Sequence, residues 1–237
     1  SRDRWRTRFR LGGVWENTSP APVMMAALGD GLYRSINNGD AWTLCHLSTG
    51  RSAFGASVAK PGRVYHTGAN GVEVSEDSGA TWRSIINGLP TTVDIVQLVP
   101  SPTLPDTVLA VTSDYAVYRK TTTNGNWTRT LAPLASPPSA LPFLASSPGN
   151  PHIWYMVRPE GLLMSSDGGS TWHVGNATVN IAGALLAVDP RASSTIWRAQ
   201  TVTGTVSVWE SNNSGLNWTS RYSEAGATGS GFAATFL

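Results

Sequence analysis

Short runs in which apolar and polar residues alternate recur along the whole chain. Five of them each begin at a turn, at residues 30–35, 70–75, 114–119, 160–165 and 204–209. A more apolar run precedes each of these, at residues 23–27, 63–66, 107–111, 152–157 and 195–199, and four units carry a further run closed by proline, at residues 57–61, 96–100, 144–148 and 186–190. A period of two is typical of β-strands, and no segment keeps the 3.6-residue period of a helix. The pattern therefore predicts an all-β protein.

An eight-residue motif follows these alternating strands. Residues 35–42, 75–82, 165–172 and 211–218 align without a gap, and residues 121–127 align with one deletion. The tryptophans that end the motif, Trp42, Trp82, Trp127, Trp172 and Trp218, are 40, 45, 45 and 46 residues apart. An outer strand after each tryptophan brings the unit to four strands in about 44 residues, which is the period of a β-propeller blade.

The motif resembles the Asp-box, also called the BNR repeat, whose pattern is Ser-x-Asp-x-Gly-x-Thr-Trp. Asp-boxes recur in sialidases, sortilin-type receptors, xyloglucanase-type glycoside hydrolases and the photosystem II assembly/stability factor family. The resemblance covers nearly the whole chain and implies a β-propeller of four-stranded antiparallel blades. It leaves the function open, because function lies in sites that differ among proteins of one fold.

Each residue type in the motif has a physical role in a turn. The short polar side chain at the third position can accept hydrogen bonds from nearby backbone N–H groups. The glycine supplies a backbone conformation that side chains disfavour, and the tryptophan packs its ring into the blade. We therefore interpret the following residues as structural, with Thr123 as the nearest third-position equivalent in the gapped copy: Asn37, Gly39, Trp42, Asp77, Gly79, Trp82, Gly125, Trp127, Asp167, Gly169, Trp172, Asn213, Gly215 and Trp218.

The repeat divides the chain into five full blades within a single propeller domain. The expected blades are residues 14–50, 51–90, 91–135, 136–180 and 181–225. Residues 1–13, which contain Trp5, are similar to a shortened motif and its outer strand, and residues 226–237 are similar to an innermost strand. Two arrangements stay open: a closed five-bladed ring in which residues 231–237 join the first blade, or part of a six- or seven-bladed propeller.

Composition narrows the function classes. The 237 residues carry a net charge of +2, and only 14% are charged, against a usual share of about 25%. Cys45 is the single cysteine, which excludes an internal disulfide framework and a cysteine-based zinc site. No apolar run approaches the ~20 residues of a membrane-spanning helix, so we predict no membrane span.

The basic residues gather at the start of the chain. Arg2, Arg4, Arg6, Arg8 and Arg10 alternate with other residues in the first ten positions. Nucleic-acid binding requires a basic stripe over the folded surface, so we interpret this pattern as a strand with a solvated arginine face and predict no nucleic-acid partner. Arg4, Arg6 and Arg8 stay candidates for binding an acidic partner.

No catalytic set stands out. A sialidase resemblance would imply an arginine cluster, a Tyr–Glu pair and an Arg-Ile-Pro segment, and the last is absent from the sequence. Glycoside hydrolysis elsewhere needs two opposed carboxylates. Several acidic residues have a simple local explanation, no pair stands out, and Asp94, at the start of an innermost strand, is the least easily explained. The four histidines have no HExxH spacing. We therefore predict no catalytic residue, no metal site and no cofactor.

Aromatic residues supply the remaining candidates. Trp154 and Trp197 are placed at equivalent positions in successive blades, which favours packing between blades but is also compatible with sugar or peptide binding. The sequence thus predicts a non-enzymatic propeller that binds a protein partner and is exported or surface-associated. A glycoside hydrolase domain or excerpt and a carbohydrate-binding lectin are the alternatives.

Overall fold

The computed structural model describes residues 12–17, 23–28, 30–47, 53–68, 71–176 and 184–226, with only the backbone described for residues 12–17 and Asn176. The candidate residues Arg4, Arg6 and Arg8, and the terminal segments 1–11 and 227–237, lie outside this range. No described helix is long and apolar enough to cross a membrane.

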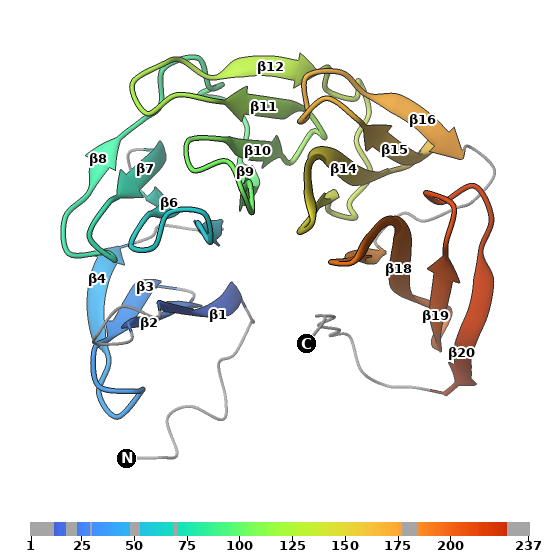
Figure 1. Ribbon diagram of the computed structural model, residues 1–237, viewed down its shortest axis with the longest axis horizontal. Coiled ribbons are helices and arrows are strands. Elements are labelled where there is room, and N and C mark those ends of the chain that lie inside the picture. The colour runs from blue at the N-terminus through green and yellow to red at the C-terminus, as the bar shows by residue number, and fades with distance from the viewer. Residues whose placement is uncertain are drawn as a thin grey trace. The chain divides into compact units, whose positions relative to one another are not determined.

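Within the described residues the chain forms twenty strands in five four-stranded sheets (Figure 1). In each sheet every strand pairs with the next one along the chain. The first sheet contains β1 (Gly12–Asn17), β2 (Val23–Leu28), β3 (Gly31–Ser35) and β4 (Thr43–Leu47). The second contains β5 (Phe54–Ala56), β6 (Val64–Gly68), β7 (Gly71–Ser75) and β8 (Arg83–Ser84). The third contains β9 (Ile95–Pro100), β10 (Val108–Thr112), β11 (Val117–Lys120) and β12 (Thr128–Leu131). The fourth contains β13 (Phe143–Ser147), β14 (Asn150–Arg158), β15 (Gly161–Ser165) and β16 (His173–Asn176). The fifth contains β17 (Leu185–Asp189), β18 (Ala192–Val202), β19 (Thr205–Ser211) and β20 (Thr219–Ala225).

The prediction of an all-β propeller with four-stranded antiparallel blades is confirmed. One predicted strand is wrong: residues 57–61 form a turn, and the first strand of the second sheet is β5. Ser57 Oγ accepts the backbone N–H of Lys60 at 3.1 Å, and the Ser57 backbone N–H reaches across to Arg63 O at 2.9 Å. Such local side-chain bonds compete with the strand ladder, and Pro61 has no N–H to contribute to it.

The chain divides into two compact units. The first comprises residues 1–101, 105–110 and 120–128, and the second comprises residues 102–104, 111–119 and 129–237. The first and second sheets belong to the first unit, the fourth and fifth belong to the second, and the strands of the third sheet are shared between them.

Each unit buries an apolar layer between two sheets. In the first unit, Val23, Met25 and Ala27 of β2 pack with Leu32 and with Val64 of the next sheet. These alternate β2 residues point to one face because successive side chains in a strand point to opposite sides.

The second unit repeats this arrangement between its fourth and fifth sheets. Its cluster includes Tyr155, Val157 and Leu162 of the fourth sheet and Leu186 and Ile196 of the fifth. In both units the hydrophobic layer joins two consecutive sheets of the chain.

From the second sheet onward, each motif tryptophan contacts the sheet that precedes its own. Trp82 packs against the cluster of the first sheet, and Trp218 packs against the cluster that the fourth sheet shares with the fifth. The Trp127 indole donates to Ile85 O at 2.5 Å, and the Trp172 indole is 3.4 Å from Thr130 Oγ1. The repeat therefore ties consecutive sheets together as well as shaping its own turn.

Candidate functional site

Four repeat turns, residues 35–42, 75–82, 165–172 and 211–218, share one hydrogen-bond pattern. In the second turn, Ser75 Oγ accepts the Gly79 N–H at 2.7 Å and donates to Asp77 Oδ1 at 2.8 Å, while Asp77 Oδ1 accepts the Thr81 N–H at 2.8 Å. The other three turns make the same three contacts, with asparagine in place of aspartate in the first and fourth: Ser35, Asn37, Gly39, Ala41; Ser165, Asp167, Gly169, Thr171; Ser211, Asn213, Gly215, Asn217.

The two aspartates of these turns are held ionised by their own loop. Burial raises the pKa of Asp77, but hydrogen bonds from the Thr81 hydroxyl and backbone outweigh it and lower that pKa to about 2. The same balance, with Thr171 as the main donor, lowers the pKa of Asp167 to about 2. Both carboxylates are therefore fixed acceptors inside the turn.

Each turn also contains two consecutive left-handed residues. In the second turn these are Ser78, with φ of 57°, and Gly79, with φ of 84°. A Cβ on Gly79 would lie 2.7 Å from Met25 Cε and 3.3 Å from Cys45 Sγ. Glycine is required there both by the backbone angle and by the closeness of the preceding sheet.

The remaining repeat turn, residues 121–127, is one residue shorter and departs from this pattern. The Gly125 N–H reaches only Thr122 O, at 3.4 Å, and Thr123 Oγ1 donates to Asp106 at 2.8 Å instead of closing its own turn. The Trp127 backbone N–H donates to Asn87 O at 2.8 Å. The missing residue has thus turned Thr123 outward, toward a neighbouring ion-pair cluster.

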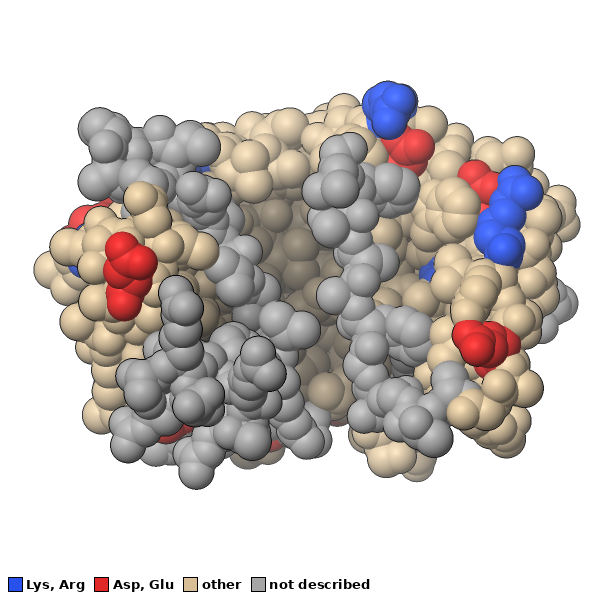
Figure 2. Space-filling model, turned by 90° about the horizontal axis from the view of Figure 1, so that it is seen from below, with Lys and Arg blue, Asp and Glu red and all other residues tan. Residues whose placement is uncertain are grey.

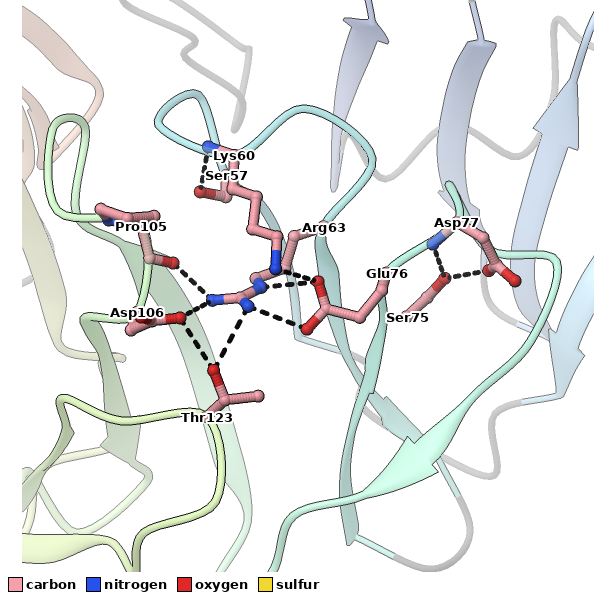
Figure 3. A network of polar contacts seen from close by, with 9 residues as sticks. All are labelled: Ser57, Lys60, Arg63, Ser75, Glu76, Asp77, Pro105, Asp106 and Thr123. Atoms are coloured by element: carbon pink, nitrogen blue, oxygen red, sulfur yellow. Dashed lines mark hydrogen bonds and ion pairs between the residues drawn. The ribbon is translucent and has the colours of Figure 1, made fainter.

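That cluster is built around Arg63, directly before β6 (Figure 3). Arg63 Nε and Nη2 each lie 2.9 Å from a Glu76 oxygen, and Nη1 lies 2.6 Å from Asp106 Oδ1 and from Pro105 O. Nη2 also reaches Thr123 Oγ1 at 3.4 Å. Every guanidinium nitrogen is therefore engaged by residues 76, 105–106 and 123.

The charges in this cluster stabilise one another. The Arg63 side chain is 2% exposed, while those of Glu76 and Asp106 are 39% and 46% exposed. Burial raises the pKa of Glu76, but hydrogen bonds from Arg63 and Lys60 outweigh it and lower that pKa, and the bond from Arg63 is the main cause that lowers the pKa of Asp106. Because its donors are all occupied, we interpret the cluster as a clamp rather than a ligand site.

A second cluster joins residues that are far apart in the sequence. His46 of β4 lies between Leu47 O, 2.9 Å from its Nδ1, and Glu73 Oε2 of β7, 2.6 Å from its Nε2. A neutral imidazole can donate to only one of these acceptors, whereas an imidazolium donates to both. The His66 ring centroid is 5.0 Å from that of His46, and the Trp82 centroid is 4.9 Å from it.

The surroundings favour a structural role for this cluster. Burial, and after it the charge of His46, lowers the pKa of His66 to about 4. Cys45, the nearest nucleophile in sequence, donates to Leu32 O at 3.2 Å, and burial raises the pKa of its thiol to about 11, so it stays protonated and unreactive. The described residues contain no group of three or more His, Cys, Asp or Glu side chains arranged to hold a metal ion.

The described candidate binding residues, Asp94, Trp154 and Trp197, come from three different sheets. Asp94 is exposed directly before β9. Trp154 is 0% exposed in β14, and its indole donates to Pro151 O at 2.9 Å. Trp197 of β18 is half-buried.

The expected equivalence of Trp154 and Trp197 is wrong by one residue. Trp154 lies opposite Ser165, the first serine of its repeat turn, whereas Ile196 lies opposite the corresponding Ser211. Trp197 therefore points to the other face of its sheet, because successive side chains alternate.

The face seen in Figure 2 carries isolated acidic and basic side chains among mostly uncharged described residues. On that face no patch of a single sign gathers over the described part of the chain. The view thus gives no sign of a charged binding surface there.

A scan against protein-family models finds no match, and no curated protein matches the chain either. Solved structures do. An ancestral GH74 enzyme superposes with a TM-score of 0.70 at 16% identity, covering 88% of this chain and 31% of that one. YCF48 from Cyanidioschyzon merolae gives 0.51 at 13% identity, covering 90% and 87%, and Saccharomyces cerevisiae Sqt1 gives 0.58 at 12%, covering 90% and 61%. The chain spans less than a third of the length of that GH74 enzyme, and these likenesses establish the β-propeller fold alone.

Proposed function

We propose that this chain is a propeller scaffold that binds a protein partner and does no catalysis. The observation that carries the proposal is the state of its carboxylates. Each described carboxylate whose pKa is clearly displaced, namely Glu76, Asp77, Asp106 and Asp167, has that pKa lowered. A glycosidase needs one carboxylic acid whose raised pKa lets it keep a proton near neutral pH.

Other carboxylates are also committed to local contacts. Glu160 pairs with Arg158 at 3.1 Å, and Asp189 Oδ1 accepts the Arg191 N–H at 2.8 Å. Such pairing uses the acids to hold strands and turns in place. The repeat-turn geometry supports the assignment of the motif as an Asp-box, which occurs in assembly/stability factors as well as in hydrolases. The lowered pKa values and the local pairing of the carboxylates favour a protein of the assembly/stability-factor type.

Catalysis is tested directly with the purified chain. It is incubated with xyloglucan and with a fluorogenic sialoside, and product release is followed over a day. We expect no release above the buffer rate. Turnover that disappears in the Asp94→Asn variant would overturn the proposal in favour of the hydrolase alternative, because Asp94 is the exposed carboxylate that sequence analysis singles out.

Binding is tested with the immobilised chain and a phage library of random peptides, and enriched peptides are then measured in solution by fluorescence polarisation. We expect a recurrent peptide motif that binds with a saturable isotherm. Binding to a glycan array together with no enriched peptide would contradict the proposal and support a lectin. We further propose that the protein is exported or surface-associated, which fractionation of the producing cells with an antibody against the chain would check.

A further inference from the structure

Arg198 of β18 is a buried arginine with no acidic partner among the residues that the structure describes. The residue is 5% exposed, and its Cζ lies 5.0 Å from the ring centroid of Trp209 and 4.9 Å from that of Trp218. Within the described part of the chain its one hydrogen bond is long, 3.4 Å from Nη1 to Gln200 Oε1, and its buried Nε has no partner. Buried charges in proteins are normally paired, so this guanidinium is unusual.

Two further buried donors flank the guanidinium. The indole Nε1 atoms of Trp209 and Trp218 are buried and have no acceptor within the described residues. Trp218 is the motif tryptophan of its sheet. Its counterparts Trp42 and Trp127 donate their indole N–H to backbone carbonyls at 3.0 and 2.5 Å, whereas the buried Nε1 of Trp82, like that of Trp218, has no acceptor within the described residues. Burying a donor without an acceptor costs free energy, and here three such donors belong to side chains in contact.

The propeller fold does not require an arginine at this position. Arg198 lies opposite Trp209 in the β18–β19 ladder, just as Met156 lies opposite Leu163 in the β14–β15 ladder of the preceding sheet. Met156 is 0% exposed. The same place can therefore be filled by an apolar side chain of similar length, which removes a purely structural reason for the charge.

No acid of the same sheet compensates Arg198. Glu210 follows Trp209 on β19 and so points to the opposite face, where its carboxylate binds Arg221 Nε at 2.6 Å. Burial alone lowers the pKa of Arg198 to about 10, which still leaves it charged at neutral pH. The positive charge thus lacks a partner within its own sheet.

We propose that Arg198, Trp209 and Trp218 bind a carboxylate group of the partner peptide. The Arg198 Cζ lies over both indole rings, which leaves the edge of the guanidinium as its donor side, and such an edge can donate two parallel hydrogen bonds to a planar carboxylate. The indole N–H groups supply additional donors. Trp209 and Trp218 are themselves only half-buried, so a ligand that contacts their exposed parts comes close to the guanidinium. The choice of a peptide as the source of the carboxylate rests on the proposed function.

The test follows the tryptophan indole resonances of the ¹⁵N-labelled chain by NMR. Acetyl-Gly-Asp-Gly-amide is titrated at neutral pH, with acetyl-Gly-Asn-Gly-amide as the matched neutral probe. We expect saturable shifts of two indole resonances, assigned with Trp209→Phe and Trp218→Phe, with a Kd on the order of 1 mM for so small a ligand. The asparagine peptide should shift neither. Glucuronate is the second probe, because a sugar acid carries the same group.

Arg198→Met, which places there the residue found in the preceding sheet, should weaken binding of the aspartyl peptide at least tenfold. Arg198→Lys should weaken it less, since it keeps the charge and loses the paired geometry. Arg221→Met is the matched control and should leave binding unchanged. Equal binding by wild type and Arg198→Met, or no binding of the aspartyl peptide by the folded wild type, overturns the inference.

The two proposals can fail separately. If phage-selected peptides bind equally to wild type and Arg198→Met, the carboxylate site is wrong and the protein-binding function stands. If the aspartyl peptide and glucuronate both bind through Arg198 but no peptide is enriched, the anion site stands and the protein-binding function fails. Tighter binding of glucuronate than of the aspartyl peptide makes a sugar acid the ligand and overturns the peptide part of the inference.

Discussion

Replacing Arg63 by methionine should lower the free energy of unfolding by about 2–4 kcal/mol at neutral pH. The guanidinium makes charge-assisted contacts with two carboxylates, each at 2.6–2.9 Å, and a hydrogen bond to a charged group contributes about 1.5–3 kcal/mol. Glu76 and Asp106 are more than a third exposed, so water replaces part of what they lose. Taking about 1.5 kcal/mol for the contact with each of the two carboxylates gives a loss of about 3 kcal/mol.

Neutralising the two carboxylates instead of Arg63 should have non-additive effects on the free energy of unfolding. Glu76→Gln or Asp106→Asn alone leaves Arg63 with one carboxylate and should cost about 1 kcal/mol. Together they leave a guanidinium that is 2% exposed without a counter-ion, which costs about 3–5 kcal/mol. The loss in the double variant should therefore exceed the sum of the two single losses by about 1–3 kcal/mol.

Urea unfolding followed by tryptophan fluorescence measures these differences. Lys60→Met is the matched control, because the Lys60 side chain is 45% exposed and its ammonium pairs with Glu76 at 3.0 Å, and an exposed pair contributes about 0.2–1 kcal/mol. Arg63→Met that is no more destabilising than Lys60→Met would refute the reasoning, as would strict additivity of the two acid substitutions.

Three further predictions concern the repeat turns and acid stability. Asp77→Ala should destabilise by about 1 kcal/mol in thermal unfolding because the turn loses its acceptor, while Asp77→Asn keeps Oδ1 and should cost less; equal losses would contradict this. Gly79→Ala should cost about 2 kcal/mol or more, since the added Cβ meets Met25 at a φ of 84°; a stable variant by the same assay would exclude that clash. The pKa values of Glu76 and Asp106 are lowered in the folded state from 4.5 and 3.8, so the unfolded chain binds more protons and stability falls as pH decreases through and below these values. Arg63→Met should flatten this decline in urea unfolding at several pH values, and an unchanged slope would count against the clamp.

The sequence predicted the sheets well because their determinants are local. Alternation and the recurrent turn motif both act within about ten residues, and the strands placed from them recur as β2, β7 and β13 with small shifts at their ends. The wrong strand prediction at residues 57–61 also has a local cause. Ser57 and Pro61 prefer a turn, and a short alternating run did not reveal that the serine captures a backbone N–H.

The register error at Trp197 was avoidable. Arg158 pairs with Gly161, and Val202 pairs with Thr205, so each hairpin has a two-residue turn. Counting back from Ser211 across residues 203–204 reaches Ile196, not Trp197. The similarity of the two Ile-Trp runs concealed this, because a one-residue slip exchanges the faces of a strand.

The ionic clusters could be predicted only in part. His66 and Glu73 are cross-strand partners in the β6–β7 ladder, and the hairpin signal Asn70-Gly71 in the sequence could have shown this pairing. The contact of Glu73 with His46 joins two sheets, and so does the contact of Arg63 with Asp106. Such contacts depend on how one sheet packs against the next, which no local pattern in the sequence encodes.

The structure also separates constant from variable positions in the repeat. The residue two places beyond the partner of the first motif serine is Ala26, His66, Met156 or Arg198 in the four sheets whose register is defined. The serine, glycine and tryptophan of the motif hold the turn and the sheet contact, so this place is free to vary. A polar side chain at this position must offset the free-energy cost of its burial. His66 does so by staying neutral, because burial lowers its pKa to about 4. Arg198 stays charged and has no acid in its sheet, so its compensation has to come from outside the blade, which is why a carboxylate ligand is expected there.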